Sequence, residues 1–183
     1  MKSPYNSYDP VGYTLAAMKL SKASSPLKQL HKTAWKFQHT FRTPRRNLSS
    51  FVSTILSSGP PLQTACVTIE VAVLEPDRLI EVLTRNSLPP QYQKGTLVIA
   101  DGRQEIEDLL CAVLYDCMDF LFVPAPKQFV IYADHDEYTT FYANTRSNLN
   151  RVAGALLANG FEEVSEYPKN AATMTSSSRL RNK

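Results

Sequence analysis

The chain has 183 residues, of which 43% are hydrophobic and 20% are charged. This balance is typical of a globular protein and excludes a wholly disordered chain. The 6 glycines and 12 prolines exclude collagen-like and glycine-rich low-complexity classes, and the formal net charge of +3 indicates no charged partner by itself.

The small net charge hides three blocks of opposite sign. Residues 1–60, the N-terminal arm, hold nine Lys and Arg but one acid, whereas the body, residues 61–168, holds seven Lys and Arg against sixteen acids. The tail, residues 169–183, holds four basic residues and no acid. We therefore expect a basic, partly helical arm, an acidic α+β domain and a basic flexible tail. Such asymmetry favours binding to a polyanion or to an acidic protein surface.

Within the arm, the apolar spacing predicts an amphipathic helix. Ser25-Pro26 is a typical helix start. The apolar positions that follow lie three or four residues apart, at Leu27, Leu30, Ala34, Phe37 and Phe41. Lysines recur every four residues beside this stripe, at Lys28, Lys32 and Lys36.

Three interpretations of this helix remain open. In the first, the apolar stripe packs on the body or on a second copy of the chain and the lysines are solvated. In the second, the cations neutralise phosphates, with aromatic side chains available for stacking. In the third, the helix lies on an anionic membrane. An organellar transit peptide is a further alternative for this Ser-rich, acid-poor segment. The predicted polyanion- or partner-binding residues are Lys28, Lys32, Trp35, Lys36, Arg42, Arg45 and Arg46, and His39 is a second stacking candidate.

The first half of the body alternates strands with helices. Residues 66–73 alternate as in a half-buried strand, residues 77–85 form a helix after Pro76, and residues 97–100 form a short central strand. From Asp101, apolar residues at helical spacing predict a heavily buried helix that continues to Leu121 and ends before two prolines.

The second half of the body begins with a predicted hairpin. Residues 129–133 and 138–142 are rich in β-branched and aromatic side chains, and four polar residues separate them. A last helix follows, capped by Asn144 or Thr145 and ending at Gly160. Residues 161–167 are predicted to form an edge strand.

The resulting order, β-α-β-α-β-β-α-β, predicts an α+β fold. We expect a mixed β-sheet with packed helices, either ferredoxin-like or a related two-layer sandwich, preceded by the basic helical arm. About 108 residues are enough to build one hydrophobic core.

No recognised catalytic or nucleotide-binding motif occurs in the sequence. The one dense cluster of metal-type ligands is Asp134-His135-Asp136-Glu137, but Thr139 and Thr145 stand where a calcium loop needs Gly and Glu. We interpret it as a solvated turn, with a metal-dependent enzyme as an alternative, and we predict neither a metal nor a cofactor. The three cysteines and the absence of a signal sequence or long apolar run favour a reduced, cytoplasmic protein, with organellar import as the alternative.

These observations favour a non-enzymatic intracellular binding or assembly protein. Its arm would dock on a polyanion, such as nucleic acid, or on an acidic protein surface, such as the body of a second copy of the chain. The alternative is an acidic inhibitor or immunity-type protein that covers the basic site of a nuclease or toxin. Its contact residues would be Glu105, Glu107, Asp108, Asp134, Asp136 and Glu137.

Overall fold

The computed structural model describes residues 18–165, which form seven strands and five helices. The strands are β1 (Lys19–Lys22), β2 (Phe37–Arg42), β3 (Thr64–Val71), β4 (Thr96–Asp101), β5 (Asp119–Ala125), β6 (Val130–Ala133) and β7 (Tyr138–Ala143). The helices are α1 (Pro26–His31), α2 (Leu48–Ser57), α3 (Asp77–Arg85), α4 (Arg103–Tyr115) and α5 (Arg146–Ala158). The predicted tail, residues 169–183, lies outside the described residues.

All seven strands belong to one antiparallel sheet in the order β1-β4-β3-β5-β6-β7-β2. The expectation of a mixed sheet is therefore wrong, although the α+β class is confirmed. The reason lies in the link between β3 and β4: α3 and the loop after it bring the chain back to the end of β3 that it left. There the backbone N–H of Gly95 donates to the carbonyl of Ile69, and β4 starts antiparallel to β3.

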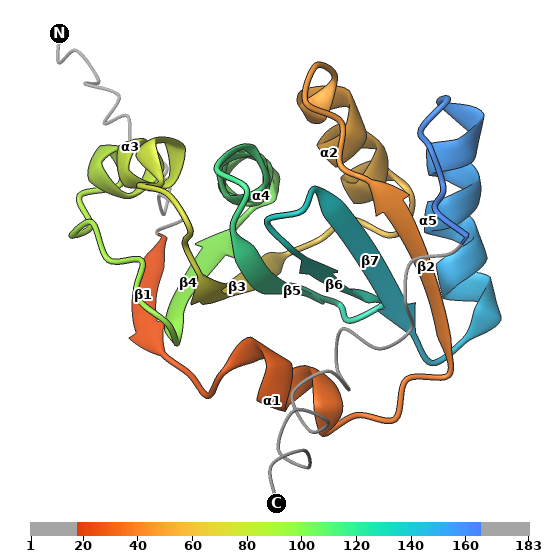
Figure 1. Ribbon diagram of the computed structural model, residues 1–183, viewed down its shortest axis with the longest axis horizontal. Helices are drawn as coiled ribbons and strands as arrows, with labels where there is room; N and C mark the ends of the chain where they lie inside the picture. Colours follow the sequence, from red (N-terminus) through yellow and green to blue (C-terminus); the bar gives the residue numbers. More distant parts are fainter. Residues whose placement is uncertain (1–17, 166–183) are drawn as a thin grey trace, which may run out of the picture.

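The helices cover the two faces of the sheet unequally. Four helices, α2 to α5, lie side by side on one face, whereas α1 alone crosses the other (Figure 1). The main core fills the space under the four helices and contains fully buried rings from β2, β5 and β7, at Phe41, Phe120, Phe122 and Phe141. A smaller apolar cluster lies under α1 and is built around Leu30, Leu121, Val130 and Tyr132.

The helix predicted from Leu27 to Phe41 is wrong beyond its first turn and a half. It ends at His31, and residues 37–42 form β2, which pairs with β7 at the edge of the sheet. The same apolar positions satisfy a two-residue repeat near the end of the segment, where Phe37, His39 and Phe41 share one face of β2. Burial of Phe41 against Phe141, with ring centroids 5.9 Å apart, favours the strand over the helix.

The helix predicted to reach Leu121 also ends early, because residues 119–125 form β5 instead. It stops at Tyr115, and Cys117 takes a left-handed conformation with φ 50° before β5 begins. A short apolar run such as Phe120–Val123 has no periodicity that separates a buried strand from a buried helix. Pro124 is tolerated because β6 pairs with β5 only at residues 120–122.

The remaining predicted elements of the body are confirmed within one to three residues, except for the last strand. Thr145 caps α5 by accepting a hydrogen bond from the backbone N–H of Asn148 at 3.3 Å, and Gly160 has φ 78°. The edge strand expected at residues 161–167 is reduced to one isolated bridge between Glu163 and Phe41, and its last two residues lie outside the described range.

Residues 18–60 of the arm pack into the same sheet as the body. They contribute β1 and β2 to its two edges, and ion pairs join them to acids of the body: Arg42 to Glu162, and Arg45 to Glu137. Ser25 takes the expected N-cap position of α1, but its side chain makes no capping hydrogen bond; its hydroxyl donates instead to the carboxylate of Glu70 on β3, at 2.5 Å. Part of the opposite charge seen in the sequence is thus neutralised within one molecule.

Candidate functional site

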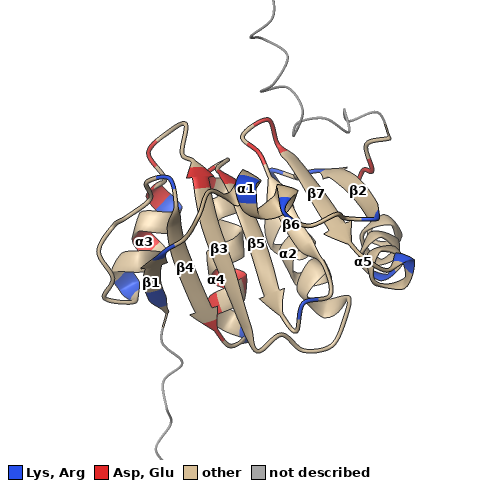
Figure 2. Cartoon of the chain, turned by 90° about the horizontal axis from the view of Figure 1, so that it is seen from below, with Lys and Arg blue, Asp and Glu red and all other residues tan. Residues whose placement is uncertain are grey.

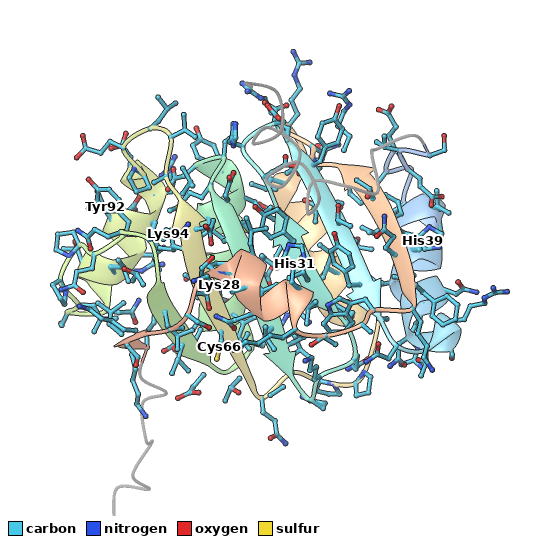
Figure 3. All side chains as sticks on the ribbon, turned by 60° about the horizontal axis from the view of Figure 1, so that its bottom comes forward. Lys28, His31, His39, Cys66, Tyr92 and Lys94 are labelled. Atoms are coloured by element: carbon cyan, nitrogen blue, oxygen red, sulfur yellow. The ribbon has the colours of Figure 1, made fainter. Side chains whose placement is uncertain are left out.

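The structure divides the predicted polyanion-binding residues among three places. Lys28 lies on α1 and Lys32 directly after it, while Trp35 and Lys36 lie in the loop that leads into β2. The three arginines follow at the other end of β2, at Arg42, Arg45 and Arg46. At 3.3 Å per residue, Arg42 lies about 20 Å along the strand from Lys36. In Figure 3, Lys28 lies in front of the sheet on α1, whereas His39 lies at the edge beside α5.

The two paired arginines, Arg42 and Arg45, lie at the C-terminal end of β2. The Arg42 guanidinium faces Glu162 at 3.6 Å, and Arg45 contacts Glu137. Hydrogen bonding to Glu137 raises the pKa of Arg45 further above its ordinary value. Only Arg46, of these three, has no ion pair with another residue in the range 18–165.

A cavity of about 530 Å³ lies at the N-terminal end of β2 and is our candidate site. We call it the aromatic–basic groove. The α1–β2 loop and β2 form one wall, and α5 forms the other. Its lining consists of Trp35, Lys36, Phe37, Gln38, His39, Arg146, Leu149 and Asn150.

The Trp35 indole is held from three directions. Its Nε1–H donates to the carbonyl of Leu30 at the end of α1, at 3.1 Å. Its ring centroid is 6.3 Å from that of Tyr142 on β7, and the Lys127 Nζ lies 5.0 Å from the indole centroid. A tryptophan in this position is oriented before any ligand arrives.

A second pairing of an aromatic ring with a cation faces the groove from α5. The Arg146 guanidinium carbon lies 5.4 Å from the ring centroid of Phe37. This contact needs α5 to pack beside β2, because more than 100 residues separate the two side chains in the sequence. A guanidinium in contact with a ring keeps N–H donors for a second partner.

The charges that line the groove are all basic. Lys36 and Arg146 line it, and no Asp or Glu does. His39, the remaining titratable group of the lining, contacts Glu163 through Nδ1. Lys36 forms no ion pair within residues 18–165. The groove therefore combines exposed cations with two aromatic rings and has no internal anion to compete with a ligand.

Sequence reasoning found Trp35, Lys36 and His39 but missed Phe37 and Arg146 in the lining, and Lys127 beside Trp35. The spacing of Phe37 also fits a helix, which predicts a place in a core stripe. Lys127 and Arg146 belong to the acidic body, and no local signal connects them with the arm. The pairing of β2 with β7 and the packing of α5 bring Arg146 to the groove, and Lys127 lies beside it through its contact with Trp35.

The residues of the predicted acidic surface do not form one cluster. Glu105, Glu107 and Asp108 belong to α4, and the other three to the β6–β7 turn. Two acids of the α4 group form ion pairs within the molecule: Glu107 with Arg103 at 3.3 Å, and Asp108 with Arg85 at 2.8 Å. Figure 2 shows acidic loops at one end of the sheet and further acidic positions on α4 behind it.

The Asp134–Glu137 turn holds its own backbone. The Asp134 carboxylate accepts from the backbone N–H groups of Asp136 and Tyr138, each at 3.1 Å, while Glu137 contacts Arg45. His135 donates toward buried Asp119, and this hydrogen bond raises the pKa of His135. Among residues 18–165, no three His, Cys, Asp or Glu side chains lie close enough together to hold a metal ion.

One buried ionic contact anchors the start of α1. Glu70 is only 4% exposed, and its carboxylate accepts hydrogen bonds from Lys94 and from Ser25. Burial alone would raise the pKa of Glu70, but these two hydrogen bonds, the charge of Lys94 and a backbone hydrogen bond from Leu27 together lower the pKa below the ordinary value. Through Ser25, this contact helps to position the helix that precedes Trp35.

Comparison with known proteins identifies no relative: no protein family, no curated protein and no solved structure matches the chain. In the part of the chain that the structure describes, no helix combines the length and the apolar character needed to cross a membrane.

Proposed function

We propose that this chain is a non-enzymatic binding protein that docks on a polyanion, specifically single-stranded nucleic acid, through the aromatic–basic groove. The observation that carries the proposal is the composition of the groove. Its lining contains two aromatic rings, Lys36 and Arg146, and no carboxylate. Proteins that bind single strands use this combination, because bases stack on rings while cations contact the backbone.

The arrangement around the groove extends the basic surface in both directions. Lys127 lies beside Trp35, and exposed Lys28 and Lys32 belong to the segment just before it. A single strand that crosses the groove would meet several cations in succession. Three phosphate contacts, from Lys36, Lys127 and Arg146, predict a log–log salt slope of about −2 for a single strand.

The chain supplies its own reporter for this binding. It contains one tryptophan, so intrinsic indole fluorescence reports on Trp35 alone. We expect titration with a 20-nucleotide oligo-dT at low salt to quench this fluorescence and to raise the anisotropy of a labelled copy of the oligonucleotide. The apparent affinity should fall with salt at the slope given above.

Three controls define the site. Arg146→Gln should weaken binding, whereas Arg151→Gln, a change of the same kind on the same helix but outside the groove lining, should not. A duplex of equal length should bind more weakly, because its bases are not available to the rings. No fluorescence or anisotropy change at low salt, or a salt-independent affinity, would contradict the proposal.

The proposal also includes a ferredoxin-like arrangement of the strands and helices. Strands β4 and β5 both lie antiparallel to β3, one on each side of it, and α4 connects them. This is the split β-α-β arrangement that ferredoxin-like folds contain. Around β2, strand β7 and the isolated bridge at Glu163 are joined through α5 in the same order, which supports a second unit of this kind.

A further inference from the structure

A second basic cavity, of about 400 Å³, lies on the helical face and does not belong to the aromatic–basic groove. We call it the arginine cavity, after the four arginines in its lining. Arg45 and Arg46 come from the β2–α2 loop, and Arg78 and Arg85 come from α3. The two pairs are more than 30 residues apart in sequence, so only the packing of these elements against α4 brings the four side chains together.

Apolar side chains form part of the lining of the arginine cavity. Leu48, Val82 and Ala112 are buried side chains in its lining. Tyr115, 58% exposed, forms part of the wall, and the Arg78 guanidinium carbon lies 5.1 Å from its ring centroid. Burial raises the pKa of the Cys111 thiol to about 11, so this part of the lining is uncharged at neutral pH.

Three of the arginines are oriented by carboxylates before a ligand binds. Arg78 contacts Glu81 at 3.0 Å, Arg85 contacts Asp108 at 2.8 Å, and Arg45 contacts Glu137. A guanidinium has five N–H donors, so one carboxylate leaves donors available for a second anion.

The charge of the lining remains positive after these pairings. It contains four arginines but only two carboxylates, Glu81 and Asp108. Arg46 has no ion pair within residues 18–165. With Glu137 counted as the partner of Arg45, the excess is one positive charge, that of Arg46, so binding of an anion also depends on the N–H donors that the paired arginines keep.

The spacing of the arginines selects an extended anion. Arg78 and Arg85 are seven residues apart on α3, so their backbone attachments lie about 10 Å apart at 1.5 Å per residue. Their side chains are already directed by different acids, which disfavours convergence on one small ion. A volume of about 400 Å³ is also within the range of small-molecule sites, about 300–1,000 Å³.

We propose that the arginine cavity binds a small ligand with two or more adjacent phosphate groups. Phosphate oxygens accept paired hydrogen bonds from guanidinium groups, and adjacent phosphates present such oxygens to more than one arginine. The volume of about 400 Å³ leaves room for a non-phosphate part. The shared chemistry is the phosphate chain of either an inorganic polyphosphate or a nucleoside triphosphate.

Calorimetric titration of the full chain tests this proposal with four compounds: tripolyphosphate, ATP, orthophosphate and citrate. We expect tripolyphosphate and ATP to bind at least tenfold more tightly than the other two. Equal affinity of tripolyphosphate and ATP would identify the phosphate chain as the ligand, and tighter binding of ATP would identify the nucleotide; either result supports the site. Undetectable binding of both, or citrate binding as tightly as tripolyphosphate, would overturn it.

Variants locate the binding and separate it from nucleic-acid binding. Arg85→Gln and Arg46→Gln should each weaken tripolyphosphate binding at least fivefold, whereas Arg151→Gln and Lys36→Gln should leave it unchanged. All four side chains are exposed, and thermal unfolding verifies that each variant is folded. Tripolyphosphate binding that survives both cavity substitutions would overturn the assignment, whatever the outcome of the oligonucleotide titration.

Discussion

The two ends of β2 carry basic residues that the structure treats differently. At the C-terminal end, Arg42 and Arg45 pair with Glu162 and Glu137 of the same molecule. At the N-terminal end, Lys36 lies in a groove that no carboxylate lines. Two clusters that are equally basic in sequence therefore differ in the charge that they offer to a partner.

This difference shows why net charge along a sequence is a poor guide to a binding surface. The +8 of the arm suggested one continuous basic element, but part of that charge holds the arm on the body. What is left for a polyanion depends on which acids the fold brings near each cation. The following predictions test the contrast between the two ends of β2, in order of decreasing effect.

The largest expected effect concerns Glu70, which anchors the start of α1, the helix that precedes the N-terminal end of β2. Glu70→Gln removes the negative charge that accepts from Lys94 and Ser25 and should lower the free energy of unfolding by about 1.5–3 kcal/mol, as for hydrogen bonds to charged groups. Urea unfolding at pH 7 measures this change.

The pH dependence gives an independent check of the same anchor. The pKa of Glu70 is lowered in the folded state, so its contribution is complete above the ordinary pKa of an unfolded glutamate and is lost as the pH falls through the folded value. Glu70→Gln should therefore reduce the loss of stability on acidification. An unchanged acid profile would show that Glu70 does not anchor α1 through its charge.

The next effect concerns stacking in the groove. Trp35→Ala should weaken oligo-dT binding by about 1–3 kcal/mol, or roughly 5- to 150-fold, as for loss of one base–aromatic contact. Fluorescence anisotropy of the labelled oligonucleotide measures it. Trp35→Phe, which keeps a ring, should retain part of the affinity; equal losses in both variants would argue against stacking.

A smaller effect separates free cations from paired ones. Lys36→Gln should reduce the magnitude of the salt slope for oligonucleotide binding by about 0.7, the value for one phosphate contact on a single strand. Arg45→Gln should leave the slope unchanged, because Glu137 already neutralises Arg45. Equal changes in both variants would remove the distinction between the two ends of β2.

The smallest effect concerns the exposed pair at the C-terminal end. The side chains of Arg42 and Glu162 are 50% and 69% exposed, and such surface pairs contribute about 0–1 kcal/mol. Arg42→Gln should therefore change the urea midpoint only slightly, and the change should vanish at high salt. A loss comparable to that of Glu70→Gln would mean that this pair is a main anchor of the arm.

Much of the body could be predicted from its local patterns. Strand β3 alternates cleanly, α3 and α5 have well-marked starts, and the four polar residues at 134–137 separate two strongly β-forming segments. In these places local preference and tertiary packing agree. Both segments that were wrongly assigned, β2 and the region of β5, have apolar positions that fit a helix and a strand equally well.

The candidate site was only partly accessible to sequence reasoning. Trp35 and Lys36 stand out because aromatic and basic residues are neighbours in the chain there. Arg146 has no such neighbour, since its relation to Phe37 arises from the packing of α5 beside β2. The arginine cavity is a stronger case, because its two pairs of arginines come from segments on either side of β3 in the sequence.

The sequence by itself determined the α+β class, most elements of the body and the uneven distribution of charge, because these depend on composition and on short-range periodicity. Tertiary structure alone decided that residues 37–42 form an edge strand, that the sheet is antiparallel throughout, and which cations meet an acid of the same chain. Those outcomes depend on long-range strand pairing and on burial of rings such as Phe41, which local spacing does not record.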